Sequence, residues 1–158
     1  MERRDKINYY LDIAETVSER GTCIRRNFGA IIVKHDEIIS TGYVGAPRGR
    51  KNCCDLNYCT RERLNIPKGE RYELCRSVHA EANAIISAAR NDMIGADLYL
   101  VCRDYRTGQL VPGTSSCSTV SYTHLDVYKR QAFARVINAI AEKKGAEEGA
   151  PAAEAAAE

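Results

Sequence analysis

The feature that most constrains the fold is an uninterrupted apolar run, Phe28-Gly-Ala-Ile-Ile-Val33. Its lack of polar positions and its β-branched residues predict a strand that is buried within a sheet. A polar turn over Lys34–Glu37 separates this run from a second strand, predicted over Glu37–Tyr43, so the two should pair as a hairpin. A third strand is predicted over Ala96–Cys102.

Two helices are predicted around these strands. Apolar residues recur at helical spacing over Ile7–Ser18, where Asp5 can cap the start and Gly21 ends the segment. Val78–Arg90 is rich in alanine and predicts a helix that packs closely against a sheet. The order helix, hairpin, loop, helix and strand indicates a layered α/β domain. The loop over Arg48–Arg76, here called the cysteine loop, is polar and long enough to indicate a function of its own.

Length and charge limit the function classes. A chain of 158 residues can build one domain with a hydrophobic core, and its apolar content of 44% is ordinary for a globular protein. The net charge of +2, with no Lys/Arg tract, argues against a nucleic-acid-binding surface. No segment has the length and apolarity of a membrane span or the pattern of a signal peptide, so a cytoplasmic location without membrane attachment is expected.

His79 and Glu81 carry the clearest chemical signal, because they lie two positions apart where the alanine-rich helix begins. Hydrolytic deamination needs a metal that makes hydroxide from water and a carboxylate that moves protons. Zinc base deaminases combine a His-x-Glu segment with a later Pro-Cys-x-x-Cys segment. The alternatives are a helix-start histidine and a carboxylate that is favoured by the helix dipole.

Three segments carry a family resemblance: Arg25–Ala30, Ser40–Pro47 and Cys75–Ile85. In this order they resemble the cytidine and deoxycytidylate deaminase family, with the bacterial deoxycytidylate deaminase branch the most similar, and the similarity extends from about Arg4 to Ser118. The resemblance implies a three-layer α/β/α cytidine-deaminase-like fold with a mixed sheet, whose C-terminal part is missing or replaced here. It also implies hydrolysis of deoxycytidine monophosphate (dCMP) to deoxyuridine monophosphate (dUMP) and ammonia.

The resemblance assigns roles residue by residue. His79 corresponds to a zinc ligand, Glu81 to the residue that carries protons, and Cys117 to the first cysteine of the second motif. Ser116 replaces the proline of that motif, and Val120 stands where its second cysteine belongs. Catalytic zinc usually has three protein ligands, so the third ligand is missing and we expect this chain to be inactive or poorly folded. The resemblance further implies a small nucleotide substrate, a nucleoside triphosphate regulator and a homo-oligomer in the intact parent.

The seven cysteines are odd in number and are expected in a reducing compartment, which argues against a disulfide framework. Relatives often carry a second, structural zinc, and four thiolates could form such a site. The candidate ligands are Cys23, Cys53, Cys59 and Cys75. Their spacing alone does not show that they meet, and buried cysteines can also act as small apolar residues. Cys54 and Cys102 are expected to be unliganded.

Candidate substrate contacts also follow from the resemblance. Asn27, Tyr43 and Gly45 are candidates for the sugar and base. The phosphate could be bound by arginine forks, and the candidate cations are Arg25, Arg26, Arg48, Arg50 and Lys51. For each of these cations, ordinary surface charge is the alternative.

The deaminase pattern stops after residue 119, so the deaminase domain is assigned to residues 1–119. Val120–Gln131 has neither helical nor strand periodicity. It can be encoded by DNA that is nearly its own reverse complement, half of which resembles a transposon end used in sequencing-library preparation. We therefore interpret residues 120–131 as an adapter-derived junction. Residues 132–158 combine a helix-capable stretch with an Ala/Glu-rich tail that is predicted to be disordered.

Two other functions compete with this interpretation. A base deaminase acting on tRNA or single-stranded DNA would use the same zinc chemistry. It would need a basic groove and stacking aromatics, and the chain has no Trp, two Phe and nine Tyr. A non-catalytic zinc-binding module held by the four upstream cysteines is the other alternative.

Overall fold

The computed structural model describes residues 3–67 and 69–112. Strands β1 (Arg26–Lys34), β2 (Glu37–Tyr43) and β3 (Asp97–Asp104) form one sheet in the order β2-β1-β3. Both outer strands run antiparallel to β1, so the predicted hairpin and the third strand are confirmed. Within the described residues the sheet is antiparallel throughout, and the mixed pairing implied by the resemblance is not among these strands.

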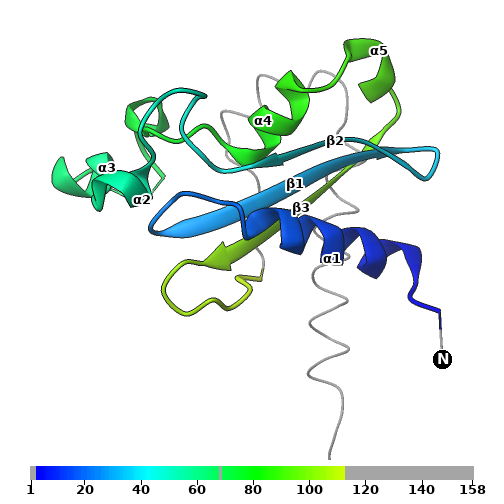
Figure 1. Ribbon diagram of the computed structural model, residues 1–158, viewed down its shortest axis with the longest axis horizontal. Coiled ribbons are helices and arrows are strands. Elements are labelled where there is room, and N and C mark those ends of the chain that lie inside the picture. Colours follow the sequence, from blue (N-terminus) through cyan, green and yellow to red (C-terminus); the bar gives the residue numbers. More distant parts are fainter. Residues whose placement is uncertain (1–2, 68, 113–158) are drawn as a thin grey trace, which may run out of the picture.

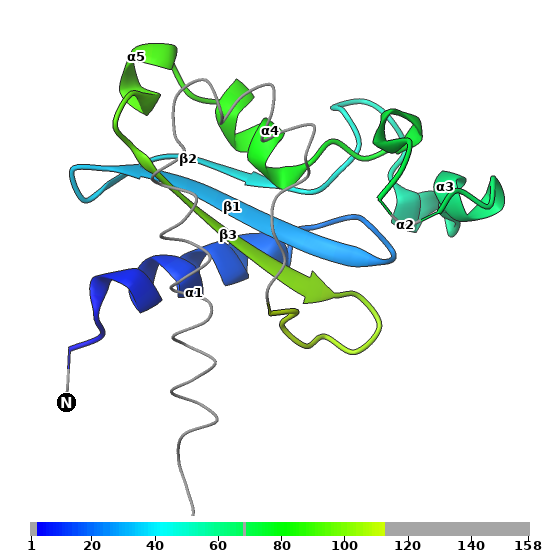
Figure 2. The ribbon, with the colours of Figure 1, turned by 180° about the vertical axis from the view of Figure 1, so that it is seen from behind.

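Helices cover both faces of this sheet. Helix α1 (Lys6–Ser18) lies on one face and helix α4 (Ala80–Ile86) lies on the other, as the two opposite views show (Figures 1 and 2). Residues of β1 alternate between the layers: Ile31 and Val33 pack toward α1, whereas Ala30 and Ile32 pack toward α4. This alternation explains the uninterrupted apolar run, because both faces of the strand are buried. The fold is therefore of the predicted layered α/β class.

Helix α1 forms where the sequence predicts it. The carboxylate of Asp5 accepts a hydrogen bond from the backbone N–H of Asn8 (3.0 Å) and caps the first turn. The helix packs directly on the backbone of β1, because a Cβ atom on Gly29 would lie 2.1 Å from the carbonyl oxygen of Ala14. Glycine at this position lets the helix and the strand approach each other closely.

The hairpin between β1 and β2 closes through His35 and Asp36, which both have left-handed backbone conformations (φ 51° and 65°). Two successive left-handed residues give a turn whose twist matches that of the flanking strands. Lys34 and Glu37 pair directly across this turn. The polar turn predicted over Lys34–Glu37 is thus confirmed, and it sets the register of the hairpin.

Two predictions about helices need correction. The helix predicted over Val78–Arg90 is shorter, since α4 ends at Ile86 and a separate short helix, α5 (Arg90–Met93), follows. The hydroxyl of Ser87 donates to the carbonyl of Asn83 (2.8 Å), and such a side-chain bond competes with continued helix.

The cysteine loop also contains regular structure that the sequence did not predict. It holds α2 (Cys53–Leu56), α3 (Thr60–Arg63) and a 3₁₀ turn, η1 (Tyr72–Leu74). Both short helices lie at the end of the sheet that the N-terminus of α4 faces (Figure 1). No helix within the described residues is long and apolar enough to cross a membrane.

Candidate active site

Helix α4 is held against the edge strand β2 by a close backbone contact. A Cβ atom on Gly42 would lie 2.3 Å from the carbonyl oxygen of Ala80 and 2.4 Å from the backbone nitrogen of Ala84. Only glycine allows this approach. The hydroxyl of Ser40, which is buried, donates to the carbonyl of Ala84 (2.7 Å). The first turn of α4 therefore has a fixed position relative to β2.

The candidate catalytic residues lie at the start of this helix. His79 is the N-cap residue, with an extended backbone (φ −67°, ψ 149°), and its side chain does not cap the helix. The preceding residue, Val78, exchanges two backbone hydrogen bonds with Gly45 (2.7 and 3.2 Å), which fixes the approach to the helix. Glu81 lies in the first turn and is 2% exposed. A half-buried imidazole and a buried carboxylate thus flank one helix terminus.

The surroundings of His79 favour its neutral form. Burial lowers the pKa of the imidazole below its ordinary value, and the positive charge of Arg61 lowers the pKa further. Neutral imidazole is the form that binds a metal ion, so the side chain is prepared for that role at neutral pH. The donor chemistry at the helix start therefore fits the zinc that the resemblance implies.

A tyrosine of the cysteine loop contacts the imidazole and an arginine of the same loop lies behind that tyrosine, and no sequence signal pointed to either. The ring of Tyr72 contacts that of His79 edge to face, with centroids 5.5 Å apart and an interplanar angle of 81°. The guanidinium of Arg61 lies 4.3 Å from the centroid of the Tyr72 ring, and Arg61 is 5% exposed. In a loop rich in Arg and Glu, nothing in the sequence separates a buried arginine from exposed ones such as Arg63.

Two of the predicted substrate contacts lie close to the start of α4. The carbonyl of Tyr43 accepts a hydrogen bond from the side-chain amide of Asn83 (2.8 Å), and Gly45 pairs with Val78. A third candidate, Arg26, lies on β1 two residues before Phe28, which packs on the α4 side of the sheet. Strand alternation therefore puts Arg26 on the face that α4 covers.

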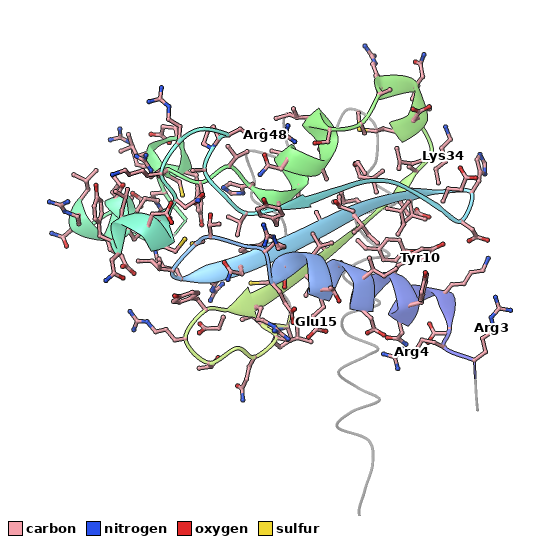
Figure 3. All side chains as sticks on the ribbon, in the orientation of Figure 1. Arg3, Arg4, Tyr10, Glu15, Lys34 and Arg48 are labelled. Carbon is pink, nitrogen blue, oxygen red and sulfur yellow. The ribbon has the colours of Figure 1, made fainter. Side chains whose placement is uncertain are left out.

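Asn27 lies on the opposite face of the sheet from Arg26. Asn27 is paired across the sheet with Arg103, whose guanidinium donates to Glu15 (2.7 Å) and Glu19 (3.2 Å). Paired residues point to the same face, and Glu15 belongs to α1 on the side of the sheet away from α4 (Figure 3). Asn27 therefore faces the α1 layer, and its contact with the sugar stays a prediction. Its side-chain oxygen is buried and has no hydrogen-bond partner within the described residues.

The remaining phosphate candidates are spread over the cysteine loop and the segment before β1. Arg25 forms an ion pair with Glu62 (3.0 Å), so its guanidinium already has an acidic partner. Arg48, Arg50 and Lys51 are exposed, and Arg48 extends from the loop after β2 on the α4 side of the sheet (Figure 3). Their exposed positions are explained equally well by an ordinary charged surface and by a phosphate-binding site.

The four candidate structural ligands lie within electrostatic range of one another. Burial raises the pKa of the Cys53 and Cys75 thiols, and the neighbouring thiols Cys23 and Cys59 raise both values further. Cys53 also shares a hydrogen bond with the buried hydroxyl of Ser77 (3.5 Å). Within residues 3–67 and 69–112, however, no group of three or more His, Cys, Asp or Glu side chains is arranged to hold a metal ion.

Other predictions fall on residues that the structure does not describe. Cys117, Ser116 and Val120 lie outside the described residues, as do the junction at residues 120–131 and the segment at residues 132–158. Of the predicted catalytic zinc site, the described part of the chain contains His79 and its neighbour Glu81.

Comparison with known proteins identifies related sequences over most of the chain. The model of the cytidine and deoxycytidylate deaminase zinc-binding region matches residues 4–123. A deoxycytidylate deaminase of Mycobacterium phage D29 is 41% identical over 106 residues, which cover 63% of this chain and 80% of the phage protein. A deoxycytidylate deaminase of Schizosaccharomyces pombe is 33% identical over 95 residues, which cover 60% of this chain and 29% of the yeast protein.

One solved structure that aligns with this chain is also that of a deaminase. The apo crystal structure of the dCMP deaminase from the cyanophage S-TIM5 aligns with a TM-score of 0.46 and 26% sequence identity. The alignment covers 63% of this chain and 67% of the cyanophage chain.

Proposed function

Because the chain belongs to the cytidine and deoxycytidylate deaminase family, we propose that its reaction is the hydrolysis of dCMP to dUMP and ammonia. The observation that carries the proposal is the pair at the start of α4, a half-buried His79 followed two residues later by a buried Glu81. The nucleotide substrate is supported by the relatives that are named deoxycytidylate deaminase.

Zinc bound by His79 would supply hydroxide at neutral pH by lowering the pKa of water. Glu81 would take the proton of the attacking water and pass it to the ring nitrogen N3 of cytosine as the new C4–O bond forms. The same carboxylate would then move the proton of the new C4 hydroxyl to the amino group, so that the C4=O bond of uracil forms, the C4–N bond breaks and ammonia leaves. Its burial keeps bulk water from competing for these protons.

We infer that Val120 limits this activity. The family motif has a cysteine at this position, and a valine side chain has no atom that can coordinate zinc. His79 and Cys117 would then be the protein ligands that the family pattern retains. The chain as it stands should bind catalytic zinc weakly and turn over slowly or not at all, whereas Val120→Cys should improve both.

We also propose a structural zinc for the cysteine loop, with Cys23, Cys53, Cys59 and Cys75 as its ligands. The mutual effect of these thiols on the pKa values of Cys53 and Cys75 supports the proposal, because it places the four thiols within electrostatic range of one another; among the described residues they are not arranged as a metal site, so binding would have to draw them together. The raised pKa values keep the metal-free thiols of Cys53 and Cys75 protonated at neutral pH, so binding must displace protons from them. Affinity for the metal should therefore increase as the pH rises.

The substrate class can be tested with the full-length Val120→Cys chain. We expect dUMP and ammonia from dCMP, with much slower reaction of deoxycytidine and of a cytosine-containing oligonucleotide. Reaction of the oligonucleotide alone would contradict the proposal and favour a nucleic-acid base deaminase. A nucleoside triphosphate regulator and a homo-oligomer remain predictions from the resemblance, which the same assay with added triphosphates and a sedimentation measurement would test.

A further inference from the structure

Among residues 3–67 and 69–112, the imidazole of His79 has no partner for the hydrogen bond that usually orients a metal-binding histidine. Such a histidine ordinarily donates its second ring N–H to a carboxylate, a carbonyl or water, which sets the ring orientation. Within the described residues, His79 neither caps its helix nor forms a side-chain hydrogen bond. Its described ring contact is the edge-to-face packing with Tyr72. Of the described contacts, packing against Tyr72 is therefore the one that can orient the imidazole.

Tyr72 is itself held by a buried cation. The guanidinium of Arg61 lies over the Tyr72 ring at 4.3 Å, a distance at which cation and ring attract each other. The same guanidinium donates through Nη2 to the carbonyls of Pro67 (2.8 Å) and Glu70 (2.6 Å), just before Tyr72 in the chain. Arg61 thus fixes both the backbone that leads to Tyr72 and the face of its ring.

The burial of Arg61 needs a reason beyond surface charge. Arginine is almost never fully buried unless it is paired, yet Arg61 is 5% exposed. No carboxylate among the described residues lies within ion-pair distance of its guanidinium, and its Nε atom is buried there without a hydrogen-bond partner. In place of an acidic partner, Arg61 contacts two backbone carbonyls and the face of the Tyr72 ring. These contacts connect separate parts of the loop, so Arg61 stabilises the loop's conformation.

From these contacts we propose that Tyr72 and Arg61 are positioning residues that orient the imidazole of His79. The contacts run in sequence from the guanidinium to the tyrosine ring and from that ring to the imidazole. The backbone on the other side of His79 is fixed independently by the Val78–Gly45 pairing and by α4. The proposal rests on the proposed function in so far as it treats His79 as a zinc ligand, but the orientation can be measured without metal.

The chain contains a matched control for this arrangement. The guanidinium of Arg63, which is exposed, lies 4.5 Å from the centroid of the Tyr58 ring, in the same loop and at nearly the same distance as in the Arg61–Tyr72 pair. Neither residue has a described contact with His79. Replacement of Tyr58 therefore removes a similar pair without affecting the imidazole.

The test compares Tyr72→Leu, Tyr72→Phe, Arg61→Lys and Tyr58→Leu in the full-length chain. Three-bond NMR couplings of His79, measured without metal, report whether its χ1 angle has one value or an average. Competition with a chromophoric chelator gives the affinity for Zn²⁺. We expect a single rotamer in the parent chain and averaging in Tyr72→Leu, with zinc affinity reduced about 10-fold or more. Arg61→Lys should give an intermediate result, because lysine cannot both stack and reach two carbonyls.

Tyr72→Phe and Tyr58→Leu should match the parent in both measurements, since the ring and not the hydroxyl contacts His79. The proposal is overturned if His79 keeps one rotamer in Tyr72→Leu, or if Tyr72→Phe is as damaging as Tyr72→Leu. Thermal unfolding of each variant separates a local effect from loss of the fold, and Tyr72→Phe provides the decisive comparison if Tyr72→Leu does not fold. Because these measurements do not use dCMP, an inactive parent chain would refute the proposed function without affecting them.

Discussion

The layered sheet and the cysteine loop are held together by different forces. Side chains from β1, β3 and both covering helices form apolar cores on the two faces of the sheet, and α1 and α4 approach the strand backbones at Gly29 and Gly42. In the described part of the cysteine loop, the buried side chains are Cys53, Cys59 and Arg61. The hydrophobic effect stabilises the first region. The second depends on hydrogen bonds and, on our proposal, on a metal.

This difference matters for the active site, because the two regions meet at His79. The layered sheet fixes the backbone at the start of α4, whereas the cysteine loop supplies the ring that contacts the imidazole. A change in the layered sheet should therefore affect stability and activity together. A change in the loop should affect metal binding and local order while most of the fold persists.

The largest effect is expected from Gly42→Ala. The added methyl group would overlap the backbone of α4 at Ala80 and Ala84, and neither contact can be relieved by rotating a side chain. We expect a loss of about 3 kcal/mol or more in the free energy of unfolding, measured by urea denaturation. Gly95→Asn is the control, since Gly95 has a positive φ (76°) with open space around it, and asparagine tolerates that conformation. Equal stability of Gly42→Ala and the parent would contradict the proposed close packing.

An intermediate effect, confined to the loop, is expected when zinc is removed with a chelator or when Cys75 is replaced by serine. Amide hydrogen exchange should accelerate in the cysteine loop while the amides of β1 and β3 remain protected. Cys54→Ser is the matched control, because Cys54 is exposed in the same loop and is not among the proposed ligands. Unchanged exchange in the loop after both treatments would argue against the structural zinc.

A small effect, confined to the layered sheet, is expected from Asp5→Ala. The backbone N–H of Asn8 stabilises the Asp5 carboxylate and lowers its pKa. A lowered pKa contributes stability above the ordinary carboxyl range, and this contribution is lost as the pH falls through the folded-state pKa. The variant should melt slightly below the parent at neutral pH, and this gap should narrow in acid. A gap that widens in acid would show that Asp5 acts in another way.

The layered sheet was largely predictable from the sequence because its pattern is strong. The apolar run, the polar turn and the capped amphipathic helix each have a local signal, and all three elements form where they are predicted. The side to which Asn27 points was not predictable. In a strand buried on both faces, the sequence does not show which residues face which helix. That assignment needed the pairing with Arg103 and the contacts of Arg103 with α1.

The candidate site was predictable only in part. His79 and Glu81 have a specific spacing and context, so their chemistry could be inferred from the sequence. The burial of Arg61 and its stacking on Tyr72 depend on how the loop folds, and the sequence carries no periodic pattern there. The spacing of Cys23, Cys53, Cys59 and Cys75 in the sequence likewise does not show how close the four thiols lie, because this distance also depends on how the loop folds.

The most direct test of the account is the rate of dUMP formation from dCMP in three full-length chains: the parent, Val120→Cys, and Val120→Cys combined with Glu81→Gln. The account predicts that Val120→Cys is faster than the parent, and that Glu81→Gln then lowers the rate by about 100-fold or more. Zinc content should be the same in the two variants, because Glu81 is not a ligand. A parent as fast as Val120→Cys, or a rate that does not respond to Glu81→Gln, would contradict the central claim that the start of α4 is the catalytic centre.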